Sequence, residues 1–400
     1  MYSPSPEILK KYADVLIHFA LWSGEGVKKG DVVYLQVPES AKPILIPLQT
    51  AVLEAGAHPI IHYIPEGGIS RNYFERATME QITWQPQSYL LERIKTITHV
   101  VSILSESDKF ELKGVDSEKI MAAGKSAKFY MDARHDKENA GQLTWVLGLF
   151  GTQAMADEAK LGLEEYWNEI IQACFLDKAD PIAEWQRAFV RIEKTRTWLN
   201  DMKIESVHVE GPDIDLHVKL GSDRNWLGGS GRNIPSFELF ISPDWRGTNG
   251  RVKFNQPLYR YGNLITGIEL EFKDGLVISS KATQNEKLLK DMIAVEGANK
   301  IGEYSLTDRR LSRITHFMAE TLFDENMGGP FGNTHLALGM SYRDSFTGDL
   351  SKVSEKEWQE RGFNDSSVHT DIISTTDRTV TATLPSGKKQ VIYRDGMFTL

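Results

Sequence analysis

The segment from residue 31 to residue 64 has the order strand, helix, strand, and this order constrains the fold more than any other feature of the sequence. Residues 31–37 form a short β-rich run, and residues 41–55 are long enough for a helix that ends at Gly56. Residues 59–64 have the pattern of a second, buried strand. Strands joined by a helical crossover pair in parallel. We therefore expect a parallel sheet.

The alternation of strand and helix signals continues through the first half of the chain. A helix is predicted to start at Pro6, capped by Ser5. Another strand is predicted at residues 99–104, after helical stretches near 73–94, and residues 128–131 are a further strand candidate. We interpret residues 1–180 as an α/β domain with a parallel or mixed sheet.

The second half has a different pattern. Helical periodicity is present at residues 155–175 and 182–199, and Asp180-Pro181 separates these two segments because the residue before proline resists helix. The turn signal Lys273-Asp274-Gly275 predicts a hairpin. Further strands are predicted at 205–209, 213–220, 378–384, 390–394 and 397–400, and helices at 286–293 and 309–323. Residues 181–400 are thus predicted to form an α+β domain.

Composition excludes several classes of protein. A single cysteine, Cys174, rules out an intrachain disulfide and a cysteine-based zinc site, and its helical pattern places it in the core. The net charge of -9 argues against nucleic acid as the main partner. No apolar stretch approaches the roughly 20 residues of a spanning helix, and the N-terminus lacks an apolar signal core. We expect a cytoplasmic protein without a membrane partner.

Metal-capable side chains concentrate between residues 233 and 371. They lie in four pieces: residues 235–240, 301–303, 322–326 reaching His335, and 369–371. Two histidines with up to five carboxylates and no thiolate suit Zn²⁺, Co²⁺ or Mn²⁺, singly or as a pair. His369 and Asp371 point to the same side of an extended segment. No compact motif such as HExxH is present, so these residues alone leave open a metal site or ordinary loop side chains.

Other signals are weaker. The glycine-rich run at 228–231 lacks the Lys-Ser/Thr of a phosphate-binding loop, and we interpret it as a turn. No GxSxG motif supports a serine hydrolase. His316, within the helix predicted at 309–323, is assigned to packing or to the surface.

Taken in order, the four pieces resemble the thermophilic metallopeptidase family that includes aminopeptidases T and S. Further matching positions are Gly30-Asp31-Val32-Val33, Glu54-Ala55-Gly56-Ala57 and His335-Leu336-Ala337-Leu338-Gly339. The resemblance covers nearly the whole chain. It implies a two-domain metallo-aminopeptidase that hydrolyses N-terminal residues from short peptides with a water activated by two divalent ions (Zn²⁺, Co²⁺ or Mn²⁺), and usually a homodimer.

The resemblance also implies roles for individual residues. The implied metal ligands are Glu238, Glu303, Glu325, His335, His369 and Asp371. Glu303 would bridge the ions or assist the attacking water. Tyr342, seven residues past His335, would stabilise the developing oxyanion.

The chain departs from the family pattern at one place. Glu325 and His335 are ten residues apart here and closer together in the family. The intervening residues 326–334 are rich in glycine and contain Pro330, so we expect a compact loop that reshapes the pocket for the substrate side chain.

Two alternative functions stay open: another two-metal hydrolase acting on phosphoesters or amides, and a catalytically inert binding protein that keeps the fold.

Overall fold

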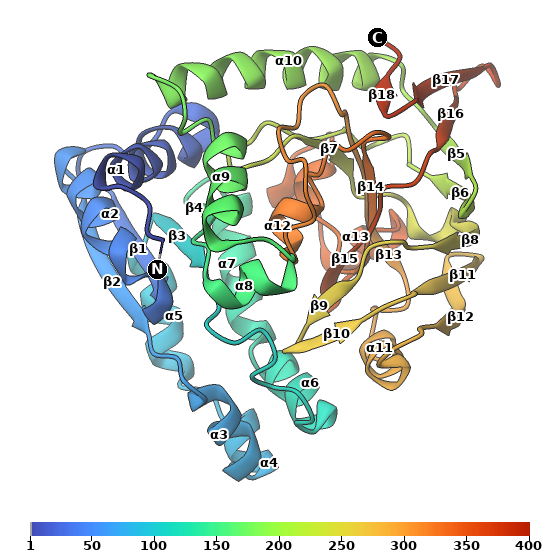
Figure 1. Cartoon of the computed structure of the whole chain (residues 1–400). Coiled ribbons are helices and arrows are strands. Elements are labelled where there is room, and N and C mark those ends of the chain that lie inside the picture. The colour runs from blue at the N-terminus through green and yellow to red at the C-terminus, as the bar shows by residue number, and fades with distance from the viewer. Residues whose placement is uncertain (1) are drawn as a thin grey trace. The chain divides into compact units, whose positions relative to one another are not determined.

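The structure is a computed structural model that describes residues 2–400, apart from the side chain of residue 351. The chain divides into two compact units (Figure 1). The first holds the chain up to residue 190 with residues 229–236 and 316–323, and the second holds residues 191–228, 237–315 and 324–400. The domain boundary predicted between residues 180 and 181 stays a prediction.

The first unit contains the predicted parallel sheet, which has four strands, the fourth of them (β4) not predicted. The strand order is β2-β1-β3-β4, and every pair is parallel. The strands are β1 (Val32–Pro38), β2 (His58–Ile64), β3 (His99–Leu104) and β4 (Thr144–Leu149). β2 was expected to be buried, but Ile61 and Tyr63 are exposed, because β2 lies at the edge of the sheet and only β1 pairs with it.

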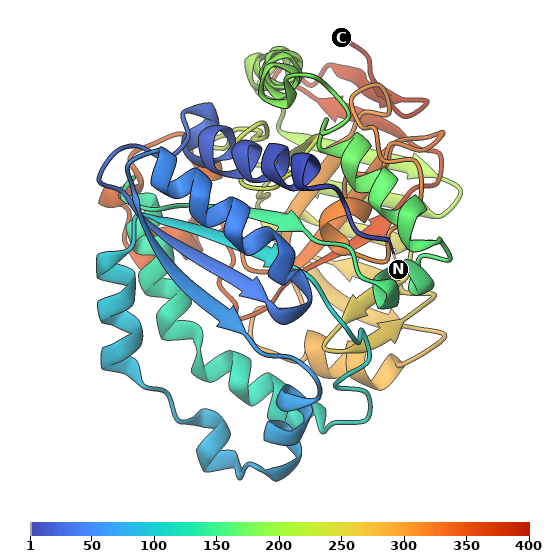
Figure 2. The ribbon, with the colours of Figure 1, turned by 60° about the vertical axis from the view of Figure 1, so that its left-hand side comes forward.

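Helices cover both faces of this sheet. The helices of this unit are α1 (Pro6–Val15), α2 (Lys42–Glu54), α3 (Ile69–Arg76), α4 (Met79–Thr83), α5 (Gln87–Thr96), α6 (Ser117–Ser126), α7 (Lys128–Asn139), α8 (Gln153–Glu158) and α9 (Leu163–Ala173). Of these, α3 and α4 lie away from the sheet (Figure 1). Figure 2 shows α1 and α2 side by side. The predicted start of α1 is confirmed, since Ser5 Oγ accepts a hydrogen bond from Ile8 N at 3.3 Å. Cys174 is fully buried, as expected.

Two predictions in this unit are wrong. Residues 128–131 begin helix α7, in which Lys128 pairs with Asp132 one turn later at 2.8 Å, a contact that favours helix over strand. The predicted continuous helix at 155–175 is broken between α8 and α9, where Lys160 has a positive φ of 59°.

The helix predicted at 182–199 is confirmed as α10 (Pro181–Asp201).

The second unit is built from antiparallel sheets. One has eight strands in the order β12-β11-β8-β6-β5-β16-β17-β18, and another has four in the order β15-β14-β13-β7. The strands of the larger sheet are β5 (Ser206–Gly211), β6 (Ile214–Lys219), β8 (Asn249–Lys253), β11 (Glu269–Lys273), β12 (Leu276–Lys281), β16 (Thr379–Thr383), β17 (Lys389–Arg394) and β18 (Met397–Phe398). Those of the smaller sheet are β7 (Glu238–Ile241), β13 (Ile301–Thr307), β14 (Asn333–Gly339) and β15 (His369–Ser374). Apolar side chains from both sheets, including Leu216 and Leu336, belong to one buried core.

The remaining elements are short. β9 (Leu258–Arg260) pairs with β10 (Asn263–Ile265), and the helices are α11 (Glu286–Ile293), α12 (Thr321–Asp324) and α13 (Glu355–Glu360). The hairpin predicted at Asp274-Gly275 joins β11 to β12, and both turn residues have positive φ. The fold class is therefore confirmed: a parallel α/β unit followed by a mostly antiparallel α+β unit.

The helix predicted at 309–323 does not form, apart from α12 at its end. Asp308 accepts a hydrogen bond from Arg310 N at 2.8 Å and also binds the Arg310 guanidinium, which replaces the first helical turn with a local loop. Ala319 has a positive φ of 53°, which a helix does not tolerate. No helix within residues 2–400 is both long and apolar enough to cross a membrane.

Candidate metal centre

The four-stranded sheet of the second unit carries five of the six sequence-predicted metal ligands. Glu238 begins β7, Glu303 lies on β13, His335 on β14, and His369 and Asp371 on β15. The sixth, Glu325, directly follows α12. These strands lie next to each other in Figure 1.

Strand register brings these side chains together. Ala337 on β14 is opposite Glu303 on one side and Asp371 on the other. His335 is two residues from Ala337 along β14, and therefore points to the same face of the sheet. Glu303 and Asp371, which are 68 positions apart in sequence, therefore lie close together because their strands flank β14.

Two glycines allow the strands to approach closely beside the ligands. A Cβ on Gly302 would lie 2.2 Å from the carbonyl oxygen of Met340, and a Cβ on Gly339, whose φ is +108°, would lie 1.9 Å from the carbonyl oxygen of Val368. No other residue fits either position without a shift of the backbone. The Gly302-Glu303 pair of the sequence is explained by this contact.

The histidine of β14 is the centre of the cluster. His335 Nε2 lies 2.9 Å from Glu303 Oε1, 3.4 Å from Glu238 Oε2 and 3.7 Å from Asp371 Oδ1. The second histidine, His369, has its Nε2 3.6 Å from Asp371 Oδ1 and 3.8 Å from Glu303 Oε2. Glu303 thus directs one carboxylate oxygen toward each histidine.

The ligand atoms form two overlapping groups that share one residue. One oxygen or nitrogen from each of Glu238, Glu303 and His335 lies within 4.8 Å of the others, and the same holds for Glu325, His335 and Asp371. The structure therefore brings Glu325 to the cluster in spite of the longer segment between it and His335.

The cluster is buried and rich in negative charge. Glu238, Glu303 and Glu325 are each no more than 6% exposed, and His335 is 1% exposed. Within residues 2–400, the ion pairs of Glu238, Glu303 and Asp371 are with His335 and His369 only. Burying several carboxylates against two imidazoles is costly unless a further cation compensates them.

The pKa values of the buried groups reflect the negative charge of the cluster. Burial, together with the charges of Glu303 and Asp371, raises the pKa of Glu238 to about 7. Burial opposes protonation of His335, but the hydrogen bond to Glu303 and the neighbouring carboxylates outweigh it and raise its pKa to about 9. Asp371 likewise raises the pKa of His369 to about 9 against burial. A site that holds protons this strongly attracts cations.

Two groups that the sequence analysis missed orient the ligands. Ser305 Oγ donates a hydrogen bond to Glu238 Oε2 at 2.9 Å. The carbonyl oxygen of Met340 lies 2.9 Å from His369 Nδ1, which leaves Nε2 directed to the carboxylates. The alternation of a strand could have found Ser305, because it is two residues from Glu303 on β13; the backbone carbonyl leaves no signal in the sequence.

The predicted catalytic tyrosine lies beside the cluster. The ring of Tyr342 stands edge-on to the ring of His369, with centroids 4.8 Å apart. Its backbone N–H donates to Ser242 Oγ at 2.8 Å, which fixes the segment after β14.

Most of the segment 326–334 forms a compact loop, and its last two residues begin β14. Asn333 Nδ2 donates to the carbonyl oxygen of Asp324 at 2.5 Å and so joins the two ends of the loop. Asn326 Oδ1 accepts from Phe237 N at 2.6 Å, next to Glu238. The loop is therefore tied at both ends to residues that adjoin predicted ligands.

Comparison with known proteins places these features in a family. The model of the thermophilic metalloprotease (M29) family matches residues 5–398. Aminopeptidase 2 of Geobacillus stearothermophilus is 28% identical, covering 97% of each chain. Aminopeptidase PepS of Streptococcus thermophilus is 28% identical over 98% of this chain and 97% of its own.

A solved structure has the same fold. Wild-type AmpT from Thermus thermophilus superposes with a TM-score of 0.81 at 23% sequence identity, over 98% of this chain and 99% of that chain. In sequence, Aminopeptidase T of Thermus thermophilus is 26% identical, covering 98% of this chain and all of that protein.

Proposed function

The chain belongs to the thermophilic metalloprotease (M29) family, and on that premise we propose that it is a metal-dependent aminopeptidase that removes N-terminal residues from short peptides. The names of its relatives, Aminopeptidase 2, PepS and Aminopeptidase T, support this activity. We propose further that it uses two divalent ions, of Zn²⁺, Co²⁺ or Mn²⁺.

The observation that carries the proposal is the shared position of His335 and Glu303. His335 belongs to two groups of candidate ligands, and Glu303 faces both histidines with different oxygens. A carboxylate such as Glu303, whose two oxygens face different histidines, can be shared by the two ions of a two-metal hydrolase. A single structural ion would require only four ligands.

The residues present fit such ions. The donor set is oxygen and imidazole nitrogen without thiolate, which suits borderline divalent ions, and its buried negative charge calls for cations. The residues that would hold the ions are Glu238, Glu303, Glu325, His335, His369 and Asp371. When bound, the ions supply the positive charge that polarises the scissile carbonyl and makes water a nucleophile at neutral pH.

The proton transfers are assigned to Glu303. Its carboxylate accepts a proton from the attacking water and returns it to the nitrogen of the leaving peptide, as general base and then general acid. Its Oε1 lies 2.9 Å from His335 Nε2, so the carboxylate lies within the proposed centre.

Tyr342 stabilises the tetrahedral intermediate. Its phenol donates a hydrogen bond to the developing oxyanion, and its ring is held against the ring of His369. The negative potential of the carboxylates favours the positively charged free amine at the start of a peptide over a neutral, blocked end.

Paired substrates test the activity. We expect hydrolysis of aminoacyl p-nitroanilides and of short peptides with a free amine, and none of the same peptides after N-acetylation or of p-nitrophenyl phosphate. Chelation should abolish hydrolysis, and adding Co²⁺, Zn²⁺ or Mn²⁺ should restore it. Equal cleavage of the acetylated peptides would contradict an aminopeptidase. Phosphoester hydrolysis alone would support the other two-metal hydrolase, and no hydrolysis with any ion would support an inert binding protein.

We also propose a homodimer, the assembly that the family resemblance implies. Sedimentation equilibrium should give twice the chain mass of 45.2 kDa, and a monomer mass at micromolar concentration would contradict it.

A further inference from the structure

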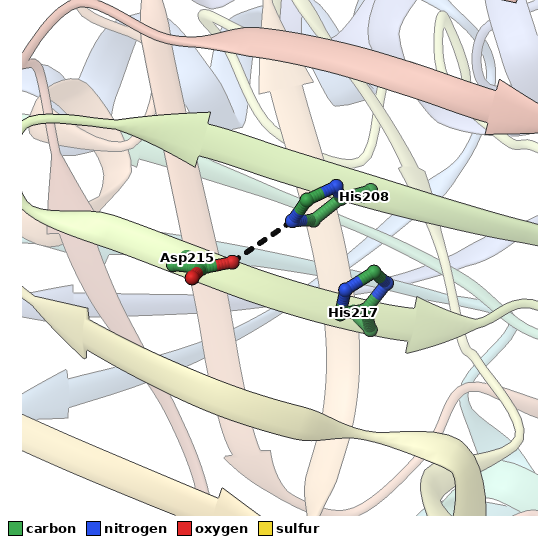
Figure 3. Close-up of side chains that lie close together, drawn as sticks. All are labelled: His208, Asp215 and His217. Carbon is green, nitrogen blue, oxygen red and sulfur yellow. Dashed lines mark hydrogen bonds and ion pairs between the residues drawn. The ribbon is translucent and has the colours of Figure 1, made fainter.

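A second cluster of metal-binding side chains lies on the eight-stranded sheet. Its members are His208 on β5 with Asp215 and His217 on β6, and one ligand atom of each lies within 4.8 Å of the others. Figure 3 shows the three side chains gathered over two neighbouring strands. They share no residue and no strand with the candidate metal centre. We propose that they form a surface site for a borderline divalent ion such as Zn²⁺ or Cu²⁺.

Strand pairing presents these groups on one face. His208 is directly opposite His217 in the antiparallel pair, and Glu210 is opposite Asp215. Opposite residues project to the same side, as do residues two apart along one strand. The intervening side chains, such as Leu216, are buried in the core and fix the register. The candidate ligands therefore stand on rigid strands and not on a loop.

His208 has the environment of a metal-binding histidine. Its Nε2 lies 2.8 Å from Asp215 Oδ1, and its Nδ1 lies 3.4 Å from Glu210 Oε2. A metal-bound imidazole commonly has one nitrogen on the ion and the other held by a carboxylate. We assign Glu210 to the orienting role, so that His208 Nε2 and Asp215 face the ion.

His217 supplies the second nitrogen. Its ring is stacked on the ring of His208, with centroids 3.8 Å apart and an angle of 10° between the planes. The stacked imidazoles thus bring two nitrogen donors together with the Asp215 carboxylate.

Neighbouring cations favour borderline ions over hard ones. Arg251 on β8 is opposite Asp215, and the positive charge of Lys389 lies near His217. These positive charges partly cancel those of Glu210 and Asp215. Ca²⁺ and Mg²⁺ depend on oxygen ligands, whereas imidazole nitrogens suit Zn²⁺, Cu²⁺ and Ni²⁺.

Because the proposed surface site is exposed, its metal binding can be tested without interference from the buried candidate metal centre. An ion held on a resin reaches exposed side chains such as His217 but not His335, which is 1% exposed. The full-length protein without a histidine tag is applied to immobilised Cu²⁺. The test variant is His208→Gln with His217→Gln, and the control is His58→Gln, which removes an exposed histidine on β2.

We expect the unaltered protein and His58→Gln to be retained equally, and the double variant to elute at a much lower imidazole concentration. Equal retention of the double variant, or no retention of the unaltered protein, would overturn the proposal.

A stoichiometry measurement gives a second, independent readout. Titration with Zn²⁺ should show one equivalent fewer for the double variant than for the unaltered protein, and excess Ca²⁺ should not compete. The melting temperature without added Zn²⁺ serves as the folding control, because both substitutions are on the solvent side of the strands. An unchanged number of Zn²⁺ equivalents would contradict the site.

Discussion

Glu303 and His335, 32 residues apart in sequence, are joined by a 2.9 Å hydrogen bond inside a sheet where both side chains are at least 95% buried. The same carboxylate faces His369 with its other oxygen. His335 belongs to both groups of candidate ligands, and the predictions below about turnover and metal binding depend on this pair.

Replacing Glu303 with Gln should remove turnover while the fold persists. The amide keeps the size of the side chain but accepts no proton, so we expect kcat to fall by roughly 10²–10⁴-fold. The measurement is steady-state hydrolysis of an aminoacyl p-nitroanilide, with the far-ultraviolet circular dichroism spectrum as the folding check. Glu271→Gln, an exposed change of the same kind on β11, is the control. Near-normal turnover by the Glu303 variant would refute its role.

Tyr342→Phe should lower kcat by roughly 10²–10³-fold, the usual cost of removing one oxyanion donor. KM should change little, because the hydrogen bond forms in the transition state and not with the bound substrate. The ring contact with His369 remains in the variant, so its metal content should stay normal. A rise in KM with unchanged kcat would show that Tyr342 binds substrate instead.

Ser305→Ala should weaken metal binding without abolishing it. Ser305 Oγ orients the Glu238 carboxylate, and loss of such a supporting hydrogen bond typically costs 10–100-fold in metal affinity. The measurement is the metal concentration that restores half of the activity after chelation. Ser279→Ala on β12 is the matched control. If both variants recover at the same concentration, Ser305 does not position the ligand.

The first unit should lose stability in mild acid because of His99. This side chain is fully buried on β3, its Nδ1 is 2.7 Å from Thr98 Oγ1, and burial lowers its pKa to about 4 although Asp31 opposes the shift. Between pH 4 and the ordinary histidine pKa of about 6.5, the unfolded chain binds the extra proton. Stability is therefore full above pH 6.5 and is lost as the pH falls toward 4.

The loss due to His99 should be on the order of 3 kcal/mol. Urea unfolding between pH 7 and pH 4 checks this, with His99→Gln as the comparison. The variant should be less stable at pH 7 but should show a smaller fall with pH. Parallel pH profiles for the two proteins would contradict a buried neutral His99.

Strand predictions from the sequence succeeded where a short β-rich run is buried inside the sheet or where a turn has distinctive chemistry. β1, β3 and the hairpin at Asp274-Gly275 are examples. They failed where a local contact decides between two structures. Lys128 and Asp132 pair across one helical turn, and the short apolar run between them resembles a strand. Asp308 binds Arg310, and this interaction competes with a helix that the periodicity of the following residues predicted.

The candidate site was predictable in composition but not in geometry. The resemblance supplied the list of ligands, and the i, i+2 spacing of His369 and Asp371 placed both on one side of a strand. The convergence of Glu303 and Asp371 on Ala337 follows from pairing between distant strands, which no local pattern encodes. The pair of histidines on β5 and β6 was missed for the same reason, since their contact exists only when the two strands align.

Bound metal is the most direct measurement. The protein is purified without added metal or chelator, and its transition metals are counted by elemental analysis after the exposed site on β5 and β6 has been removed with His208→Gln and His217→Gln. Near two ions per chain, lost when His335 or Asp371 is replaced with Ala in that background, is the predicted result. No bound ion and no uptake of Zn²⁺ or Co²⁺, or full metal content in the Ala variants, would contradict a metal centre at His335.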